Sequence, residues 1–200
     1  MKILKYLMGL FRLNGDVSSA SGSIAGHEYV DLGLSVKWAT CNVGARSPED
    51  YGSYYAWGET SIKPSYEEVN SNTYRKEVGD IGGNAIYDAA RANWGSTWRL
   101  PTWNEIEELI KECTWTWTKM DGRKGYKVTS KVNGKSIFLS AAGDRNDLSL
   151  VNAGSYGFYW SSTPRTSNTD YAYILFFHRS NVDRDIDDRF LGQSVRPVSE

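Results

Sequence analysis

The segment from Gly143 to Leu191 lacks residue types that are frequent elsewhere in the chain. It contains seven Asp and five Arg but no Lys, Glu, Gln or Met, and Trp160 is its one tryptophan, whereas the residues before it hold eleven Lys and ten Glu. These five types account for 34 of the 200 residues, so about eight would be expected in 49 residues. They are the types that an NNY codon cannot encode. This composition would remain if many AAY codons had their adenines randomised.

Local structure offers a second explanation of the same bias. Turns and sheet edges favour Asp over Glu and disfavour long flexible side chains, which accounts for part of the bias. The absence of Lys is harder to explain in this way, because Lys is well tolerated on exposed edge strands.

The chain is also poor in residues that serve catalysis and metal binding. Cys41 and Cys113 are too few for a disulfide scaffold and lack the paired spacing of a zinc site, and they could either pair or remain free thiols. His27 and His178 supply little for a histidine-centred site. A net charge of -1, without a basic stripe, argues against nucleic-acid binding. No catalytic residue, metal ligand or cofactor is predicted.

Composition divides the chain into three parts. Apolar residues recur at helical spacing near the N-terminus, at Ile3, Leu4, Leu7, Met8 and Phe11, and predict an amphipathic helix over residues 1–13. This helix could dock onto the domain or join copies into a homo-oligomer; a degenerate export signal is the alternative, and the segment is too short to span a membrane. Residues 14–26 have linker composition, and one domain is predicted over residues 27–200.

Periodicity predicts an α+β fold with its helices in the first half. A helix is expected to start at Ser47-Pro48, and another to run over residues 85–93 and end at Gly95. The clearest helix begins at Thr102, which forms a capping-box pattern with Glu105, and ends near Cys113.

Strands are predicted mainly in the second half, which is expected to be antiparallel and rich in turns. Two short strands about a glycine turn are expected between Tyr29 and Ala39. From Thr114 the apolar period changes to two, and Asp121-Gly122 and Asn133-Gly134 are strong hairpin turns.

Four motifs, in this order, resemble a known family. They are GHEYVDLGLSVKWATCNVGA at residues 26–45, WRLPT at 98–102, YWSS at 159–162 and GQSVRPV at 192–198. Together they resemble the Fibrobacter/Bacteroides-type major paralogous domain, a branch of the C-type lectin fold related to formylglycine-generating enzymes. The resemblance covers nearly everything from residue 27 onward and implies a C-type lectin-like fold with two main helices.

Some members of this family are target proteins of diversity-generating retroelements, in which adenine-directed mutagenic reverse transcription rewrites codons near the C-terminus. The resemblance therefore implies a variable region at about residues 143–191. It also implies a frame of fixed residues within that region and at its end: Ala172, Tyr173, Leu175, Phe177, Val182, Arg189 and Gly192.

The implied function is that of a ligand-binding receptor or adhesin on a bacterial cell surface or phage virion. Its partner would be a protein or glycan on a cell or phage-host surface. The predicted ligand contacts are Asp144, Asn146, Leu148, Phe158, Pro164, Arg165, Asp170, Tyr171, Ile174, Phe176, His178, Asp183, Asp185, Ile186, Asp187, Asp188, Phe190 and Leu191.

Strand geometry divides residues 173–178 in the same way. Side chains alternate between the two faces of a strand, so Ile174, Phe176 and His178 point away from the face that carries Leu175 and Phe177. If the first face is solvated, Ile174 and Phe176 form an exposed apolar patch of the kind that binds partners. A strand buried on both faces is the alternative, since residues 171–177 are almost continuously apolar.

Other functions receive less support from the residues. The Asp-rich run 183–188 could hold calcium, but it lacks the Gly and Glu framework of an EF-hand loop, and the Glu-Pro-Asn and Trp-Asn-Asp signatures of sugar-binding C-type lectins are absent. Formylglycine-generating enzymes use cysteine near the C-terminus, and this chain has none after Cys113. A non-diversified surface adhesion domain of the same family and, less favoured, a calcium-dependent glycan-binding lectin remain as alternatives.

Overall fold

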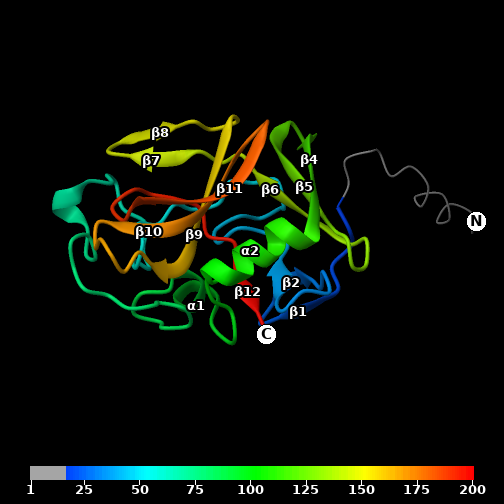
Figure 1. Ribbon diagram of the computed structural model, residues 1–200, viewed down its shortest axis with the longest axis horizontal. Helices are drawn as coiled ribbons and strands as arrows, with labels where there is room; N and C mark the ends of the chain where they lie inside the picture. The colour runs from blue at the N-terminus through cyan, green and yellow to red at the C-terminus, as the bar shows by residue number, and fades with distance from the viewer. Residues whose placement is uncertain (1–16) are drawn as a thin grey trace, which may run out of the picture.

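The computed structural model describes residues 17–200, so the helix predicted over residues 1–13 lies outside the described residues. The described part is a mixed α+β fold made mostly of antiparallel sheets, and its two α-helices are α1 (Ala89–Trp94) and α2 (Trp103–Glu112) (Figure 1). A single 3-10 turn, η1, covers Glu68–Asn70. The predicted α+β class is confirmed.

Two of the sheets are formed by the first two thirds of the chain and its end. The first contains β1 (Gly22–Ile24), β2 (His27–Val30), β3 (Lys37–Ala39) and β12 (Val198–Ser199), in that order. The second is the meander of β4 (Cys113–Met120), β5 (Arg123–Ser130) and β6 (Ser136–Ser140). Both hairpin turns of this meander lie where Asp121-Gly122 and Asn133-Gly134 predict them.

The last third of the chain forms the other two sheets. The larger contains β9 (Tyr156–Pro164), β10 (Tyr171–His178) and β11 (Asn181–Asp188), with β10 in the centre. The smaller is the hairpin of β7 (Asp144–Asn146) and β8 (Ser149–Val151), which runs directly into β9. The predicted variable region therefore coincides with these two sheets.

The capping box predicted for α2 is confirmed. Thr102 Oγ1 accepts a hydrogen bond from the Glu105 amide at 3.3 Å, and Glu105 Oε2 accepts one from the Thr102 amide at 2.7 Å. Both bonds satisfy amides that have no partner within the helix. Arg99 fixes the same carboxylate through two further bonds of 2.6 and 2.9 Å. Ile106 and Leu109 of this helix are buried.

Three local predictions differ from the structure. The helix expected over residues 85–93 begins later, because the buried Asp88 caps it by accepting bonds from the Ala90 and Arg91 amides. Residues 47–50 form a turn rather than a helix. The expected linker contains β1, which pairs with β2, so the packed domain begins before His27. Small polar residues are compatible with an edge strand, and composition alone did not reveal the pairing.

The four motifs contact one another although they are far apart in the sequence. The Arg196 guanidinium donates to the carbonyls of Ala39 and Thr40 at 3.0 and 2.8 Å. The Ser162 amide donates to the Pro101 carbonyl at 2.8 Å, and the Trp160 amide to the Ser194 carbonyl at 3.1 Å. These motifs build the scaffold that holds the sheet of β9, β10 and β11.

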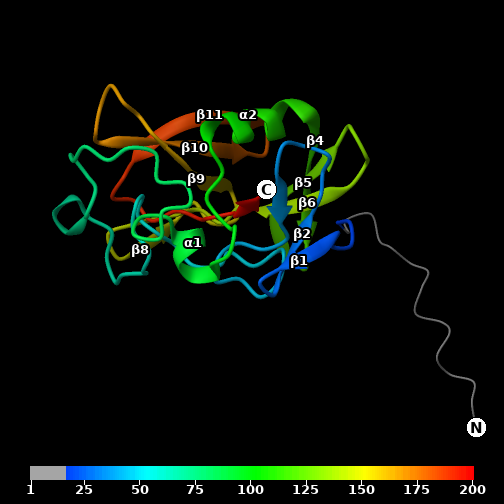
Figure 2. The same cartoon turned by 90° about the horizontal axis from the view of Figure 1, so that it is seen from below.

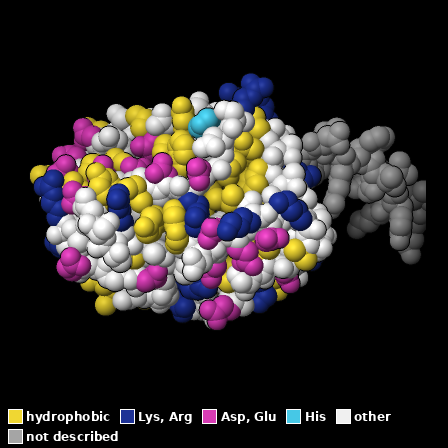
Figure 3. Space-filling view, viewed as in Figure 1, with side chains coloured by type: hydrophobic (Ala, Val, Ile, Leu, Met, Phe, Trp, Pro, Cys, Tyr) yellow, Lys and Arg dark blue, Asp and Glu magenta, His cyan; other side chains and the backbone are white. Residues whose placement is uncertain are grey.

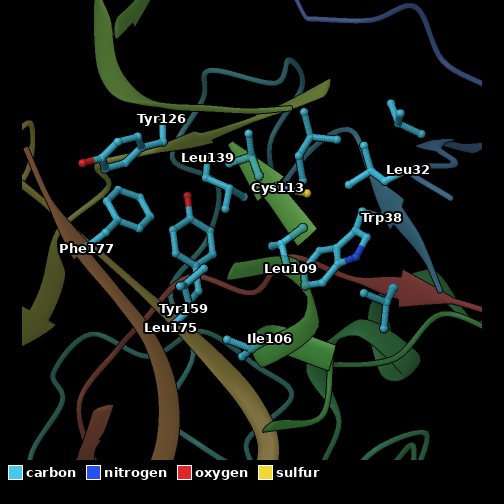
Figure 4. Packing of buried hydrophobic residues seen from close by; sticks show 14 of the residues in the cluster. Leu32, Trp38, Ile106, Leu109, Cys113, Tyr126, Leu139, Tyr159, Leu175 and Phe177 are labelled. Atoms are coloured by element: carbon cyan, nitrogen blue, oxygen red, sulfur yellow. The ribbon is translucent and has the colours of Figure 1, made fainter. Parts of the chain in front are cut away.

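Two buried clusters cover opposite faces of that sheet. Tyr159, Leu175 and Phe177 belong to the first, together with residues of α2 and β4–β6 (Figure 4). Trp160 and Ile174 belong to the second, which contains residues from the loops before α1. Seen from below, the sheet and α2 lie on one side of the molecule and α1 on the other (Figure 2).

Cys41 and Cys113 are free thiols, and Cys113 is buried. Burial raises the pKa of the Cys113 thiol to about 11, which leaves it protonated at neutral pH. Within residues 17–200, no helix has the length and apolar character needed to cross a membrane.

Candidate binding surface

One face of the β9–β10–β11 sheet brings several predicted ligand contacts together. Phe176 of β10 lies opposite Phe158 of β9 and Asp183 of β11, and the neighbouring residue on the same face, His178, lies opposite Tyr156. Side chains two residues apart share a face, so these strands present a common surface. We call it the outer face and define it by six residues: Tyr156, Phe158, Phe176, His178, Asp183 and Asp185.

The aromatic residues of the outer face form one cluster. The Phe158 and Phe176 ring centroids are 5.2 Å apart, and that of Tyr156 lies 5.9 Å from Phe176 and 5.5 Å from His178. Tyr156 is 36% exposed, and the other three are half-buried. The face of the molecule in Figure 3 shows hydrophobic and acidic side chains close together above α2. The cluster is partly solvated and can accept further apolar contacts.

The outer face is covered by other parts of the chain at Ile174. This residue is 2% exposed and packs with Trp57, Trp160 and Val195 in the second cluster. The prediction that Ile174 is exposed is wrong, because the loops before α1 cover this end of the sheet. The strand is thus buried on both sides near Ile174 and half-open from Phe176 onward.

The carboxylates of β11 line the edge of the outer face. Asp183 and Asp185 are exposed, whereas Asp187 is half-buried and accepts a bond of 2.7 Å from Gln193 Nε2. Burial, and then the neighbouring carboxylates, chiefly that of Asp144, raise the pKa of Asp187 to about 7, although the Asp188 amide acts in the opposite direction. This edge therefore presents several carboxyl groups, of which Asp187 titrates near neutrality.

The β7–β8 hairpin adds an apolar element that precedes β9. Leu148 is 68% exposed, and Leu150 and Val151 are also exposed. Asn146 is exposed, as predicted, but Asp144 is buried and accepts a bond of 3.0 Å from Asn152 Nδ2. Leu148 and Asn146 are accessible for binding, whereas Asp144 supports the hairpin.

A second group of predicted contacts lies at the opposite end of β10. The Phe190 ring packs edge-on against Tyr74 at 5.2 Å, and Asp170 lies 3.7 Å from the Arg75 guanidinium. Tyr171 is seven residues from His178, which corresponds to about 23 Å along a strand. The group comprises Arg165, Asp170, Tyr171, Asp188 and Phe190, and it is separate from the outer face.

Three other predicted contacts do not lie on the outer face. Pro164 and Leu191 are buried, and Ile186 lies opposite Tyr173 on the face that packs against α2. Strand alternation places Ile186 on that face because it is an odd number of residues from both Asp183 and Asp185.

Most of the predicted frame is buried, namely Ala172, Leu175, Phe177, Arg189 and Gly192. Arg189 is buried, its guanidinium lies 4.4 Å from the Trp57 ring, and it donates to the Tyr171 and Lys76 carbonyls at 3.0 and 2.9 Å. Gly157, which the predicted frame did not include, allows the ring of the frame residue Phe177 to lie directly against its backbone, where a Cβ would collide with the ring. These residues hold the sheet rather than a ligand.

The ligand contacts predicted from the sequence did not include the exposed residues Tyr156, Leu150 and Val151. Tyr156 could have been found, since it is two residues before Phe158 and shares its face. The described residues contain no group of three or more His, Cys, Asp or Glu side chains placed to hold a metal ion. Comparisons with protein-family models, with curated proteins and with solved structures gave no match.

Proposed function

We propose that the chain is a receptor or adhesin of the C-type lectin fold whose surface has been diversified by a retroelement. Its outer face and the β7–β8 hairpin would bind a protein or glycan on a cell or phage-host surface. The proposal includes membership of the family resembled by the four motifs, in the branch related to formylglycine-generating enzymes. The chain would act on the bacterial cell surface or on a phage virion.

One observation carries the proposal: two antiparallel hairpins of the same molecule differ in residue types. Strands β4 and β5 contain Lys119, Lys124 and Lys127 together with Met120, whereas β10 and β11 contain none of the five types that NNY codons cannot encode. Both hairpins have exposed residues. A general preference of turns and edges does not account for this difference, whereas rewriting confined to one region does.

The chemistry of the outer face suits macromolecular recognition. Partly exposed aromatic residues are the commonest anchors of protein interfaces, and Phe158, Phe176 and Tyr156 lie in contact as one group. Asp183 and Asp185 add negative charge beside them. Because charge complementarity selects partners, we expect a partner that presents Lys or Arg next to an apolar group.

A binding screen tests this function. Purified protein is tested against arrayed bacterial surface proteins and glycans, and each hit is measured again with a Phe158→Ser, Phe176→Ser double variant. We expect binding to fall at least tenfold. These rings are half-buried, so the double variant should also lose about 2–4 kcal/mol of stability.

Matched variants separate binding from stability. Asp183→Asn with Asp185→Asn removes charge from exposed positions and should weaken binding without lowering the melting temperature. Thr102→Ala destabilises the domain away from the outer face, and Ile86→Ser removes an apolar group that is 72% exposed elsewhere. Both controls should bind as the unmodified protein does. If the outer-face variants also bind unchanged, the proposed surface is wrong.

A further inference from the structure

A second concave site lies outside the predicted variable region. Its volume is about 500 Å³, and it lies between β2, the loops of residues 43–62 and the end of α1. None of the residues that line it belongs to residues 143–191. In Figure 1, β2 and α1 lie in the lower half of the molecule, below the sheet of β9–β11. The pocket is therefore separate from the outer face.

Aromatic rings form one wall of this pocket. His27 and Trp94 stack with their centroids 3.8 Å apart and their planes 4° from parallel, and Trp98 meets Trp94 edge-on at 5.3 Å. Buried Val43 and Tyr55 also line the pocket. The wall is apolar and is held rigidly, so a flat apolar face of a ligand can pack against it without ordering new side chains.

The described residues that line the pocket carry no formal charge at neutral pH. Among residues 17–200, the titratable residues of the lining are His27 and Tyr55, and burial lowers the pKa of the His27 imidazole below its usual value. The imidazole is therefore neutral at pH 7, and the lining residues within 17–200 include no Asp, Glu, Lys or Arg. A charged ligand would lose hydration here without gaining a counter-ion.

Hydrogen-bonding groups also line the pocket. Asn93 Nδ2 donates to the Thr60 carbonyl at 3.0 Å and to the Ala89 carbonyl at 2.8 Å, which fixes the amide and leaves Oδ1 as an acceptor. The hydroxyls of Thr60 and Ser61 also line the site, and within residues 17–200 they have no hydrogen-bond partner. These groups can exchange hydrogen bonds with the hydroxyls of a ligand.

We propose that this pocket binds a neutral sugar, one or two pyranose rings in size, without a metal ion. A pyranose presents C–H groups on one face and hydroxyls around its rim, which matches a lining that combines stacked aromatic rings with an amide and hydroxyls. The volume falls within the usual range of about 300–1,000 Å³ for small-molecule sites. The inference rests on the pocket alone and does not depend on a diversified outer face.

Titration with a defined sugar panel tests the inference. Glucose, galactose, mannose and N-acetylglucosamine, together with disaccharides of these, are titrated in EDTA while the tryptophan indole N–H signals are followed by NMR. We expect saturable shifts for at least one sugar, with a dissociation constant on the order of 1 mM. Glucuronic acid and glucosamine, which are charged, should bind at least tenfold more weakly.

Two matched variants test whether the sugar binds in this pocket. Ser61→Phe fills the pocket from an exposed position and should reduce affinity at least tenfold. Thr116→Phe places the same side chain at an exposed position of β4, outside both the pocket and the proposed binding surface, and should leave affinity unchanged. Melting temperatures check that both variants are folded. Absence of saturable binding, unchanged binding by Ser61→Phe, or preference for a charged sugar would each overturn the inference. None of these results bears on binding by the outer face.

Discussion

Replacement of Asp187 by Asn should stabilise the protein at high pH and not at low pH. The carboxyl has an ordinary pKa of 3.8, and in the folded protein the pKa is raised to about 7, first by burial. The folded state therefore retains this proton between pH 4 and pH 7 while the unfolded state has released it. Since stability falls with pH wherever the folded state binds more protons, the native protein loses stability over this interval.

The gain in stability expected from Asp187→Asn follows from the rise in the pKa of Asp187 and from the burial of its side chain. A rise in pKa from 3.8 to about 7 corresponds to about 4 kcal/mol at about 1.4 kcal/mol per tenfold change in proton affinity. The side chain is only half-buried, and water reduces the effect, so we expect about 2 kcal/mol above pH 8. Gln193 Oε1 has no partner among the described groups, so the Gln193 amide can turn and accept a bond from the substituted side chain.

Thermal unfolding from pH 4 to pH 8 measures the difference. The Asp187→Asn variant should melt with the native protein at pH 4 and about 4–8 °C above it at pH 8. Asp183→Asn is the matched control, since Asp183 is exposed and its replacement should give no pH-dependent difference. If the variant instead melts below the native protein at pH 8, the surroundings of Asp187 stabilise its charged form and the predicted rise in pKa is wrong.

Substitutions at three further positions test the scaffold by urea unfolding. Arg189→Lys removes the planar donors that hold the carbonyls of Tyr171, Thr73 and Lys76 and the stacking on Trp57, and should cost about 3 kcal/mol; a loss below about 1 kcal/mol would contradict this role. Gly157→Ala should cost about 3 kcal/mol, because the new methyl group meets the Phe177 ring, and near-native stability would mean that the sheet yields there. Thr102→Ala should cost about 1 kcal/mol and Thr102→Ser almost nothing, since only the first loses the capping hydroxyl; equal losses would exclude capping as the cause.

The sequence correctly predicted the parts of the fold that depend on interactions between residues close together in the chain. The capping box of Thr102 and Glu105 and the hairpin turn at Asp121-Gly122 depend on residues within a few positions of each other, and both are confirmed. The start of α1 was placed too early because Asp88 also accepts bonds from Gly83 and from the distant Leu100 amide. Contacts of that kind depend on the tertiary fold.

The sequence predicted which face of β10 each side chain points to, but it did not predict how deeply each side chain is buried. Period two along β10 correctly separates Phe176 and His178 from Leu175 and Phe177. Nothing in that period indicates that Trp57 covers Ile174, because the two are more than a hundred residues apart in sequence. The pocket beside Trp94 was not predicted at all, since its walls come from three distant segments.

The DNA sequence around the gene shows whether a retroelement has diversified this surface. If a retroelement has diversified the codons of this surface, a near-identical repeat of the codons for residues 143–191 lies close to a reverse transcriptase gene. The repeat should differ from the gene at its own adenines, and the differences should change outer-face codons such as those of Phe176, Asp183 and Asp185 while leaving Leu175 and Phe177 unchanged. Differences scattered over all four bases and over the frame codons would contradict diversification by a retroelement. The absence of any repeat would contradict it as well.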